Sequence, residues 1–246
     1  MFWYHATTKH SYNSVRTNPN RLAWEDQPST YKNYPNSYEK RKLDLENEED
    51  HFLYHIAGLT AKKSYPSGEY YLRINPSAGA LYPNELYFQA RGVDGREDGI
   101  YHYEVSSASV TLLKRINDLE GLEPYFGYSS AMRGYLFLVS AVYYRSSWKY
   151  KNRAFRYCLL DAGHLLGSIE ASALLRQGSL QINYDIEREK LNRMFGFESR
   201  EWFLSGATMA EPIPQSKVEA VEFELPYVDG SRTFEVNSLI EQAYGE

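Results

Sequence analysis

The sequence predicts an α+β fold with one mainly antiparallel sheet flanked by helices. The apolar runs do not alternate regularly between strand and helix, so a parallel βαβ sheet is not indicated. Residues 132–144 (MRGYLFLVSAVYY) form a nearly continuous β-branched and aromatic run, which is typical of a buried central strand. Residues 155–176 read as a long apolar helix in which Gly163, Gly167 and Ala171 recur every four residues. This bare helix face predicts close packing, either in the core or at a dimer interface.

The other elements follow from local patterns. Residues 46–59 begin with acidic side chains and then place apolar residues on one helical face. Residues 185–195 predict a short helix opened by Asp185 and ended by Gly196, and residues 236–244 predict a last one. Strands are predicted at residues 70–75, 85–91, 99–103, 110–116 and 201–205, the third and fourth forming a hairpin.

The chain divides into three parts. The first part is residues 1–45, expected to be an extended arm that wraps over a partner surface. Residues 1–42 of it are rich in Tyr, Asn, Pro and Ser and show no helical or strand periodicity. Residues 46–207 contain the predicted sheet and its helices. Residues 208–246 contain three prolines and predict a C-terminal tail that wraps the core or a partner.

Composition limits the function classes. The 246 residues suffice for one substantial core, and the formal charge of -5 argues against nucleic acid or an anionic membrane as the partner. Cys158 is the only cysteine, which excludes an intrachain disulfide and fits a reducing compartment. The first residues lack the signal-peptide pattern, and no run reaches the ~18 apolar residues of a membrane span. We therefore expect a soluble cytoplasmic protein.

Residues 76–88 (PSAGALYPNELYF) place small residues directly before a strand. Small side chains leave backbone N–H groups open to the flat face or polar edge of a ligand, and Ser77 adds a hydroxyl donor. An ordinary turn of Pro and Gly has the same composition, and on composition alone it is the better explanation. The chain contains neither GxGxxG nor GxxxxGK, so a dinucleotide fold or a phosphate loop is not indicated.

Further motifs follow in a specific order. The sequence GIYHY lies at residues 99–103, a basic block covers residues 145–157, and DAGHLLGS begins at Asp161. Together with PSAGALYPNELY, these motifs resemble the SagB-type branch of the FMN-dependent nitroreductase superfamily, which includes the azoline oxidases of thiazole and oxazole peptide biosynthesis. The resemblance covers roughly residues 47–207. It implies an α+β sandwich that dimerises extensively, with FMN at the dimer interface.

The resemblance also implies site residues. Ser77, Ala78 and Gly79 are expected along the isoalloxazine ring, and Lys149 and Tyr150 match the Lys-Tyr pair that azoline oxidases use beside the flavin. Such an oxidation needs a base for a carbon-bound proton, and a Tyr whose pKa is lowered by a neighbouring ammonium meets that need. The pair can act together only in a loop or at a helix start, because neighbours on a strand face opposite ways. A solvated surface loop is the alternative.

Basic residues are needed for the FMN phosphate or a peptide carboxylate. Arg153 and Arg156 are candidates because guanidinium groups bind such anions through paired hydrogen bonds. Arg156 has the alternative of an ion pair with Asp161 or with another acid.

A further source of cations is the N-terminal arm. Members of the superfamily begin with an Arg-Arg-Ser-x-Arg sequence that binds the FMN phosphate, and no such sequence precedes residue 46 here. The nearest substitute offers Lys9, Ser11 and Arg16. The arm resembles the start of larger tandem members that hold two such domains. A single copy is expected to pair with itself or with a second nitroreductase-like domain or subunit.

The predicted function is that of an FMN-dependent, homodimeric oxidoreductase transferring hydride between flavin and a small or peptide-borne substrate. Two alternatives stay open: a flavin-free scaffold or partner subunit, and a flavoenzyme that reduces nitro or quinone compounds with a reduced nicotinamide. Cys158, Asp161 and His164 share a helix face, but a lone Cys and His on a helix more often lie in the core than bind metal. No metal is therefore expected.

Overall fold

A seven-stranded sheet forms the centre of the fold, and all its neighbouring strands run antiparallel. The structure is a computed structural model that describes residues 2–17, 22–65, 68–231 and 233–245. The sheet confirms the predicted α+β class. In spatial order its strands are β1 (Glu39–Lys42), β6 (Ser109–Arg115), β5 (Gly99–Glu104), β4 (Asn84–Arg91), β8 (Met132–Ala141), β10 (Trp202–Pro212) and β9 (Gln181–Asn183).

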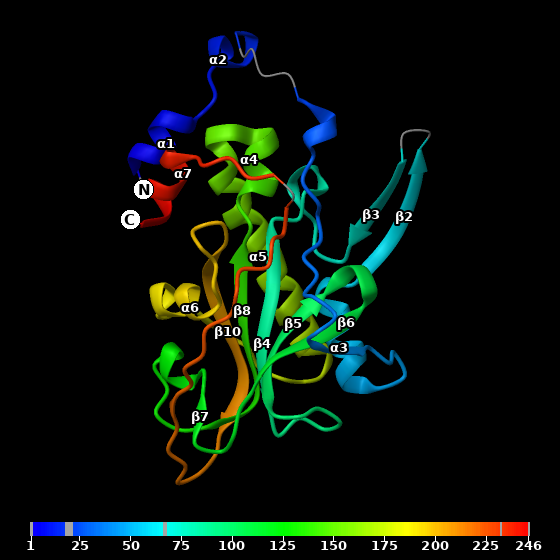
Figure 1. Cartoon of the computed structure of the whole chain (residues 1–246), viewed down its shortest axis with the longest axis vertical. Coiled ribbons are helices and arrows are strands. Elements are labelled where there is room, and N and C mark those ends of the chain that lie inside the picture. The colour runs from blue at the N-terminus through cyan, green and yellow to red at the C-terminus, as the bar shows by residue number, and fades with distance from the viewer. Residues whose placement is uncertain (1, 18–21, 66–67, 232, 246) are drawn as a thin grey trace.

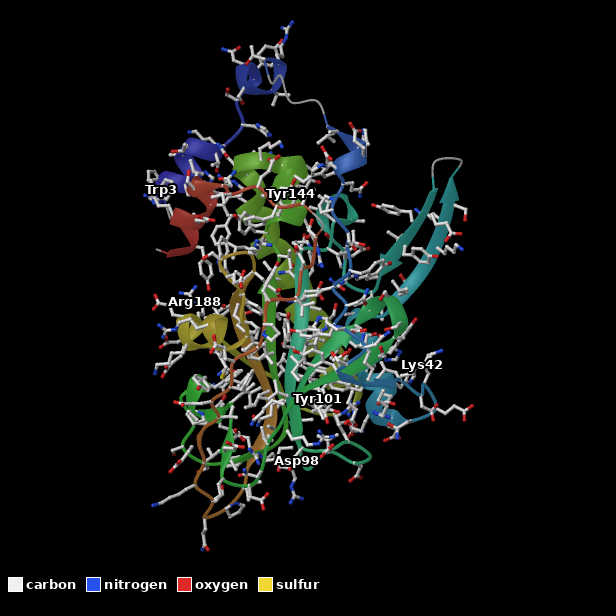
Figure 2. All side chains as sticks on the ribbon, in the orientation of Figure 1. Trp3, Lys42, Asp98, Tyr101, Tyr144 and Arg188 are labelled. Carbon is white, nitrogen blue, oxygen red and sulfur yellow. The ribbon has the colours of Figure 1, made fainter. Side chains whose placement is uncertain are left out.

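Helices cover the sheet and gather at one end of it. They are α1 (Phe2–Thr8), α2 (Tyr12–Arg16), α3 (Glu48–Ala57), α4 (Tyr144–Tyr150), α5 (Ala154–Leu175), α6 (Arg188–Met194) and α7 (Ser238–Gly245). Figure 1 shows α1, α4 and α7 at the end where both chain termini lie, with the long α5 running along the sheet. Trp3 and Tyr144 mark this end in Figure 2, whereas Asp98 lies near the other.

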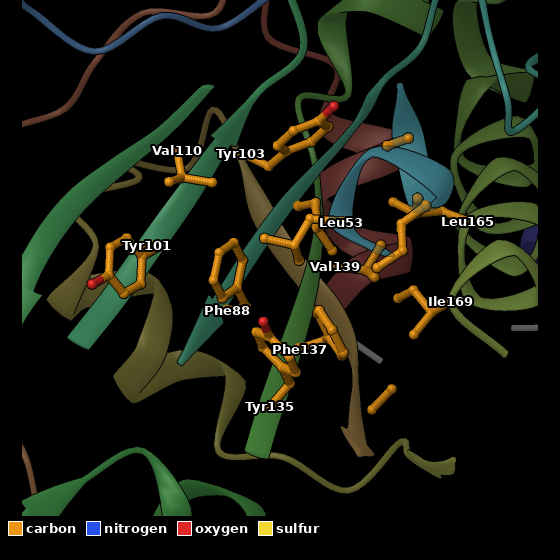
Figure 3. Close-up of a cluster of buried hydrophobic side chains, with 14 of the residues drawn as sticks. Leu53, Phe88, Tyr101, Tyr103, Val110, Tyr135, Phe137, Val139, Leu165 and Ile169 are labelled. Atoms are coloured by element: carbon orange, nitrogen blue, oxygen red, sulfur yellow. The ribbon is translucent and has the colours of Figure 1, made fainter. Parts of the chain in front are cut away.

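The core lies between the sheet and the helices α3 and α5. Phe88 of β4 pairs with Phe137 of β8, and both are completely buried. Figure 3 shows these rings beside Leu53 of α3 and beside Leu165 and Ile169 of α5. Each large apolar side chain buried here contributes about 1.5–3 kcal/mol. The prediction that residues 132–144 hold a buried central strand is confirmed, although the strand ends at Ala141 and α4 follows.

Helix boundaries differ from the predictions where capping was misjudged. Asn47 caps α3, its side-chain oxygen accepting from the N–H groups of Glu49 and Asp50, which agrees with the predicted helix. Asp185 does not open the next helix: α6 begins at Arg188 after Glu187, which makes no side-chain capping bond. Gly196 ends this helix as predicted, with a positive φ of 66°.

Two strand predictions were incomplete. The strand predicted at residues 201–205 is the start of β10, which continues to Pro212 because it pairs along its length with β8. A strand before residues 70–75 was missed: β2 (Leu59–Tyr65) pairs with β3 (Gly68–Arg73) in a separate hairpin that projects from the body in Figure 1. A short parallel pair also joins β7 (Glu120–Gly121) to β11 (Glu219–Ala220).

The N-terminal arm is more ordered than its sequence predicts. It contains α1, α2 and β1, so the expectation of no regular structure in residues 1–42 is wrong. Tertiary contacts supply the stability that such short segments lack alone. Tyr4 of α1 is buried against Phe155 and Ile240, and β1 pairs with the edge strand β6.

One buried lysine anchors the arm to the core. Lys32 Nζ lies 2.6 Å from Glu201 Oε2, and the side chains are 1% and 0% exposed. Glu201 also accepts hydrogen bonds from the Tyr87 and Ser140 hydroxyls. Four aromatic rings surround the ammonium, with centroids 5.0 to 5.7 Å from Nζ. These rings belong to Tyr34, Tyr87, Phe197 and Tyr227.

The segment Tyr144–Leu175 is long and apolar enough, by composition, to cross a membrane. It is interrupted by a 3-10 turn at Lys151–Arg153, and its buried residues pack on the sheet. The core helix of a soluble protein can have the same composition, so this feature by itself is weak evidence for a membrane span.

Candidate functional site

The loop of residues 76–83 joins β3 to β4 in an unusual backbone conformation. Gly79, Ala80 and Tyr82 all have positive φ angles, of 64°, 48° and 45°. This conformation is unfavourable for residues with a Cβ, so Ala80 and Tyr82 must be held there by surrounding contacts. Strain of this kind concentrates at functional sites. The loop is therefore a candidate functional site.

Asp161 of α5 binds the first half of the loop. Its carboxylate accepts a 2.6 Å hydrogen bond from the Ser77 hydroxyl and a 3.1 Å bond from the N–H of Ala78. The Ser77 oxygen in turn accepts from the N–H of Tyr82 at 2.9 Å. Burial raises the pKa of Asp161, although these hydrogen bonds and His164 act in the opposite direction. One carboxylate thus links both ends of the strained segment to α5.

Side chains from other elements bind two carbonyl groups of the loop, those of Gly79 and Tyr82. The Tyr70 hydroxyl, from β3, donates to the Gly79 carbonyl at 3.0 Å. Arg145 of α4 is completely buried and donates to the Tyr82 carbonyl at 2.9 Å and to Glu85 at 2.5 Å. Burial alone would raise the pKa of Glu85, but Arg145 and His102 outweigh it and lower that pKa to about 2. His102 therefore faces this buried carboxylate on β4 rather than an open cleft.

Lys149 and Tyr150 converge on the loop. A Cβ added to Gly79 would lie 2.7 Å from the Tyr150 hydroxyl and 2.9 Å from Lys149 Nζ, so both polar groups lie against the bare backbone of Gly79. The two residues form the end of α4 rather than a loop or a helix start. The turn at Lys151, with φ 47° and ψ −131°, follows directly and ends the helix there. The structure thus brings Gly79, Lys149 and Tyr150 together.

The acid–base prediction for Tyr150 is wrong in direction. Burial raises its pKa, and the neighbouring Tyr157, Asp161 and Tyr70 raise it further, whereas Arg153 lowers it. Burial and the neighbouring acids outweigh the lowering of this pKa by Arg153. Tyr150 accordingly holds its proton through neutral pH.

Arg153 and Arg156 occupy different surroundings. The Arg153 guanidinium lies 5.5 Å from the ring of Tyr157, which itself lies 4.0 Å from the ring of Tyr150. Arg156 reaches α1, where it bonds to His5 Nδ1 at 2.8 Å and to the Thr8 hydroxyl at 2.6 Å. The alternative of an ion pair between Arg156 and Asp161 is wrong, because that carboxylate accepts from Ser77 and Ala78 instead.

The arm residues Lys9, Ser11 and Arg16 are exposed and make local contacts. Ser11 caps α2 through reciprocal hydrogen bonds with Ser14. Arg16 donates to the Tyr12 hydroxyl at 2.7 Å and lies over the same ring. Figure 1 shows α2 beyond the end of α4, apart from the sheet.

Comparison with known proteins indicates which fold this chain has. A provisionally named nitroreductase of Methanocaldococcus jannaschii is 30% identical over 130 residues, which cover 50% of this chain and 59% of that protein. The crystal structure of a provisionally named nitroreductase from Anabaena variabilis superposes on 99% of this chain with a TM-score of 0.77 and 26% identity. The chain has a nitroreductase-like fold. No protein-family model matches it.

A third comparison agrees in fold alone. The E. coli microcin synthetase McbBCD complex, with truncated pro-MccB17 bound, matches 86% of this chain at a TM-score of 0.53 and 14% identity. The matched regions cover 59% of the archaeal protein and 53% of the Anabaena chain, so the present chain spans little more than half the length of either relative. Together, the likenesses support an oxidoreductase role at the level of the fold.

In this nitroreductase-like chain the bare face of α5 is exposed. A Cβ at Gly163 or Gly167 would meet nothing within 4 Å. A groove of about 490 Å³ runs along these glycines, with Pro76 of the loop and His55 and His164 on its sides. The close packing predicted for this face therefore does not occur within the described residues of one chain, which leaves the face available to a second copy.

Sequence reasoning missed two supporting residues and misread a third. Tyr70 lies in the predicted strand just before the small-residue motif, and this proximity in sequence was a usable signal. Tyr157 belongs to the basic block, but the sequence assigned it no role; its ring lies against Tyr150 and near Arg153. Asp161 was considered as a metal ligand or ion-pair partner, yet it supports the loop. Neighbouring Cys158 is buried, and burial together with Asp161 raises its pKa to about 12, so it is an unreactive thiol.

Proposed function

We propose that this protein is an FMN-dependent oxidoreductase of the SagB type, transferring hydride between the flavin and a small or peptide-borne substrate. The observation that supports it best is the convergence of Lys149 and Tyr150 on Gly79, beside the exposed groove of α5. This arrangement joins two polar groups to a bare backbone surface, which is what a flat ring with polar edges requires. The nitroreductase-like fold supports the same class of cofactor.

The residues of the loop fit a flavin ring. Gly79 is exposed and lacks the Cβ that would cover its backbone, while Ser77 and Ala78 flank it. Since the Ser77 hydroxyl and the Ala78 N–H point to Asp161, we assign these two residues to the support of the ring site rather than to its polar contacts. When bound, FMN supplies a two-electron acceptor and donor of hydride.

The phosphate end of FMN needs cations. We assign it to Arg153 and Arg156, with Lys9, Ser11 and Arg16 of the arm as further contributors. Arg156 binds α1 through His5 and Thr8, so it also brings the arm close to the start of α5. Lys9 directly follows α1 and is the arm cation nearest in sequence to that contact.

Lys149 and Tyr150 would perform the proton chemistry. Because burial raises the pKa of Tyr150, the protonated phenol is its resting form, and it donates a hydrogen bond or a proton at Gly79. The Lys149 ammonium, 5.5 Å from the Tyr150 ring, stabilises negative charge that develops at the same place. In the oxidative direction, Tyr150 would first lose its hydroxyl proton to solvent and then, as a phenolate beside the Lys149 ammonium, accept the proton from the substrate carbon.

The exposed face of α5 favours a homodimer. Apolar side chains at both ends of the helix remain exposed beside the bare glycine face. A second copy packed on this face would bury them and close the groove next to the loop. A second nitroreductase-like domain is the other partner of this kind. The exposed apolar residues are Leu159, Leu160, Leu174 and Leu175.

A flavin-free scaffold is the second candidate. It is favoured by the commitment of Arg156 to α1 and by the local contacts of Arg16, which leave fewer cations aimed at the loop. Reduction of nitro or quinone compounds with a reduced nicotinamide is a third activity compatible with the fold. A soluble, cytoplasmic location and the absence of nucleic acid partners complete the proposal.

The test is the visible spectrum of the purified protein, with released flavin identified after heat denaturation and the protein then reconstituted with FMN. We expect stoichiometric FMN and, in Tyr150→Phe and Lys149→Ala, retained flavin with turnover reduced at least ~100-fold. Tyr184→Phe and Lys63→Ala, both on exposed residues, are the matched controls. Absence of flavin after reconstitution would support the scaffold, and rapid bleaching by NADH or NADPH would support nitro or quinone reduction.

A further inference from the structure

We propose that Asp161 is the positioning residue of the candidate site: its carboxylate holds the loop of residues 76–83 so that Gly79 faces Lys149 and Tyr150. What the site does with this arrangement rests on the proposed function, but the positioning itself does not. Asp161 touches none of the proposed reacting atoms and acts through the loop.

Asp161 lies at the junction of several hydrogen bonds that hold the loop in place. It accepts from the Ser77 hydroxyl at 2.6 Å and from the Ala78 N–H at 3.1 Å, so both carboxylate oxygens are used. Ser77 then accepts from the Tyr82 N–H at 2.9 Å. The hydroxyl thereby connects the carboxylate to the far end of the loop, five residues along the chain. Asp161 thus holds the first half of the loop directly and the second half through the Ser77 hydroxyl.

The burial of Asp161 indicates a role other than ion pairing. The residue is 3% exposed, and among the described residues no Lys or Arg forms a salt bridge with it. A buried carboxylate without a cation is costly unless hydrogen-bond donors satisfy it, and here the donors come from the loop. The titratable groups that face it are Cys158 and His164 on α5 and Tyr150 on α4. An amide or apolar residue would serve core packing at lower cost.

The backbone of the loop explains why such a residue is needed. Ala80 and Tyr82 have positive φ angles, which residues with a Cβ adopt only under constraint. Released from Asp161, the segment would relax toward ordinary turn geometry. Gly79 would then move away from the Tyr150 hydroxyl and Lys149 Nζ, which now lie within 2.9 Å of its Cβ position.

Hydrogen exchange tests the positioning without a cofactor. In Asp161→Asn the shape is kept but one of the two acceptor oxygens becomes an NH2 donor, so Ser77 and Ala78 cannot both be bound as before, and we expect the amides of residues 78–82 to exchange about tenfold faster. Lys149, released from Gly79, should be acylated faster, as measured by mass spectrometry relative to Lys63. Glu170→Gln, on an exposed residue of the same helix, is the control and should change neither rate. Unchanged exchange and acylation in Asp161→Asn would overturn the proposal.

A second pair of variants covers the case in which Asp161→Asn fails to fold. Ser77→Ala removes the hydroxyl bridge, while Ser77→Thr keeps it at a backbone position, φ −141° and ψ 142°, that Thr adopts readily. We expect Ser77→Ala to accelerate exchange at Tyr82 and Ser77→Thr to restore the slow rate. Equal rates in the two variants would overturn the proposal.

Flavin binding separates this proposal from the proposed function. If wild-type protein binds FMN, Asp161→Asn should bind it at least ~10-fold more weakly, with the unfolding midpoint little changed. If wild-type protein binds none, the proposed function fails, and the exchange and acylation rates still decide the role of Asp161. Weaker FMN binding with unchanged exchange would overturn the positioning role and leave the flavin function standing.

Discussion

The loop of residues 76–83 and the N-terminal arm were assigned to one flavin site, yet the structure holds them in different ways. The loop is bound by side chains from three elements: Tyr70 of β3, Arg145 of α4 and Asp161 of α5. The arm is anchored at Lys32 and at α1, whereas between these points Arg16 contacts the nearby Tyr12 and Lys9 is exposed. Preorganised geometry is thus found in the loop that carries the PSAGALYPNELYF motif. The arm residues chosen for their chemistry alone are not preorganised.

The largest expected effect concerns the anchor of the arm. Lys32→Met leaves Glu201 ionised in the core without its cation, so we expect the free energy of unfolding to fall by about 3–5 kcal/mol in urea titrations. Lys63→Met, on an exposed residue, is the control and should change it by less than ~0.5 kcal/mol. A loss of less than 1 kcal/mol in Lys32→Met would mean that the arm is held elsewhere and that the contrast with the loop is overstated.

The buried carboxylate of Glu85, which binds Arg145 next to the loop, should affect the stability of the protein at acidic pH. Glu85 has its pKa lowered to about 2 from 4.5, so its stabilising contribution is present above pH 4.5 and is lost as the pH falls toward 2. The shift corresponds to roughly 3 kcal/mol. We expect unfolding of Glu85→Gln to depend less steeply on pH between 4.5 and 2. Glu46→Gln, on an exposed residue, should follow the wild-type profile, and an unchanged slope in Glu85→Gln would contradict the account.

A pair of glycine substitutions sharpens the description of the site. Gly79 and Gly127 both have positive φ angles, 64° and 81°, so Ala costs about 1 kcal/mol of backbone strain at either. Only at Gly79 would the new Cβ displace Tyr150 and Lys149, since at Gly127 it meets nothing within 4 Å. We expect the FMN affinity or the turnover of Gly79→Ala to be at least ~10-fold lower than that of Gly127→Ala. Equal losses would mean that strain alone is responsible.

The smallest effects are expected in the arm. Lys9→Ala and Arg16→Ala remove exposed cations and should leave the free energy of unfolding within ~0.5 kcal/mol of wild type. We expect FMN to bind roughly threefold more weakly, with the difference vanishing at high salt. Lys42→Ala serves as the control for loss of an exposed charge. A tenfold or greater loss of affinity in Arg16→Ala would show that the arm is organised at the site, which would remove the contrast drawn here.

Much of the sheet was predictable because its central strands, such as β4 and β5, are buried on both faces. The runs around Phe88 and Phe137 are apolar without interruption, and only a central strand accommodates them. The hairpin of β2 and β3 was predicted only in part, because LTAKKSY in β2 is mostly polar and residues 60–64 are exposed, although Leu59 at its start packs on the core. The short helices α1 and α2 have no local signal strong enough to distinguish them from irregular chain.

The site was predictable in its members but not in its electrostatics. The motif order brought Gly79, Lys149 and Tyr150 into one hypothesis, and the geometry of the loop supports their proximity. The direction of the Tyr150 pKa depends on burial and on Tyr157 and Asp161, whose positions follow from the packing of α4 on α5. A dipeptide carries no information about such neighbours.

The turn at Lys151 has a consequence for how the protein evolves. Its backbone, at φ 47° and ψ −131°, is one that glycine would adopt at lower cost, yet the chain keeps a lysine immediately after Tyr150. A Lys151→Gly substitution would therefore relieve this backbone strain, yet the chain keeps lysine at position 151. Such unused stability is expected where selection acts on the placement of neighbouring side chains rather than on the resistance of the fold to unfolding.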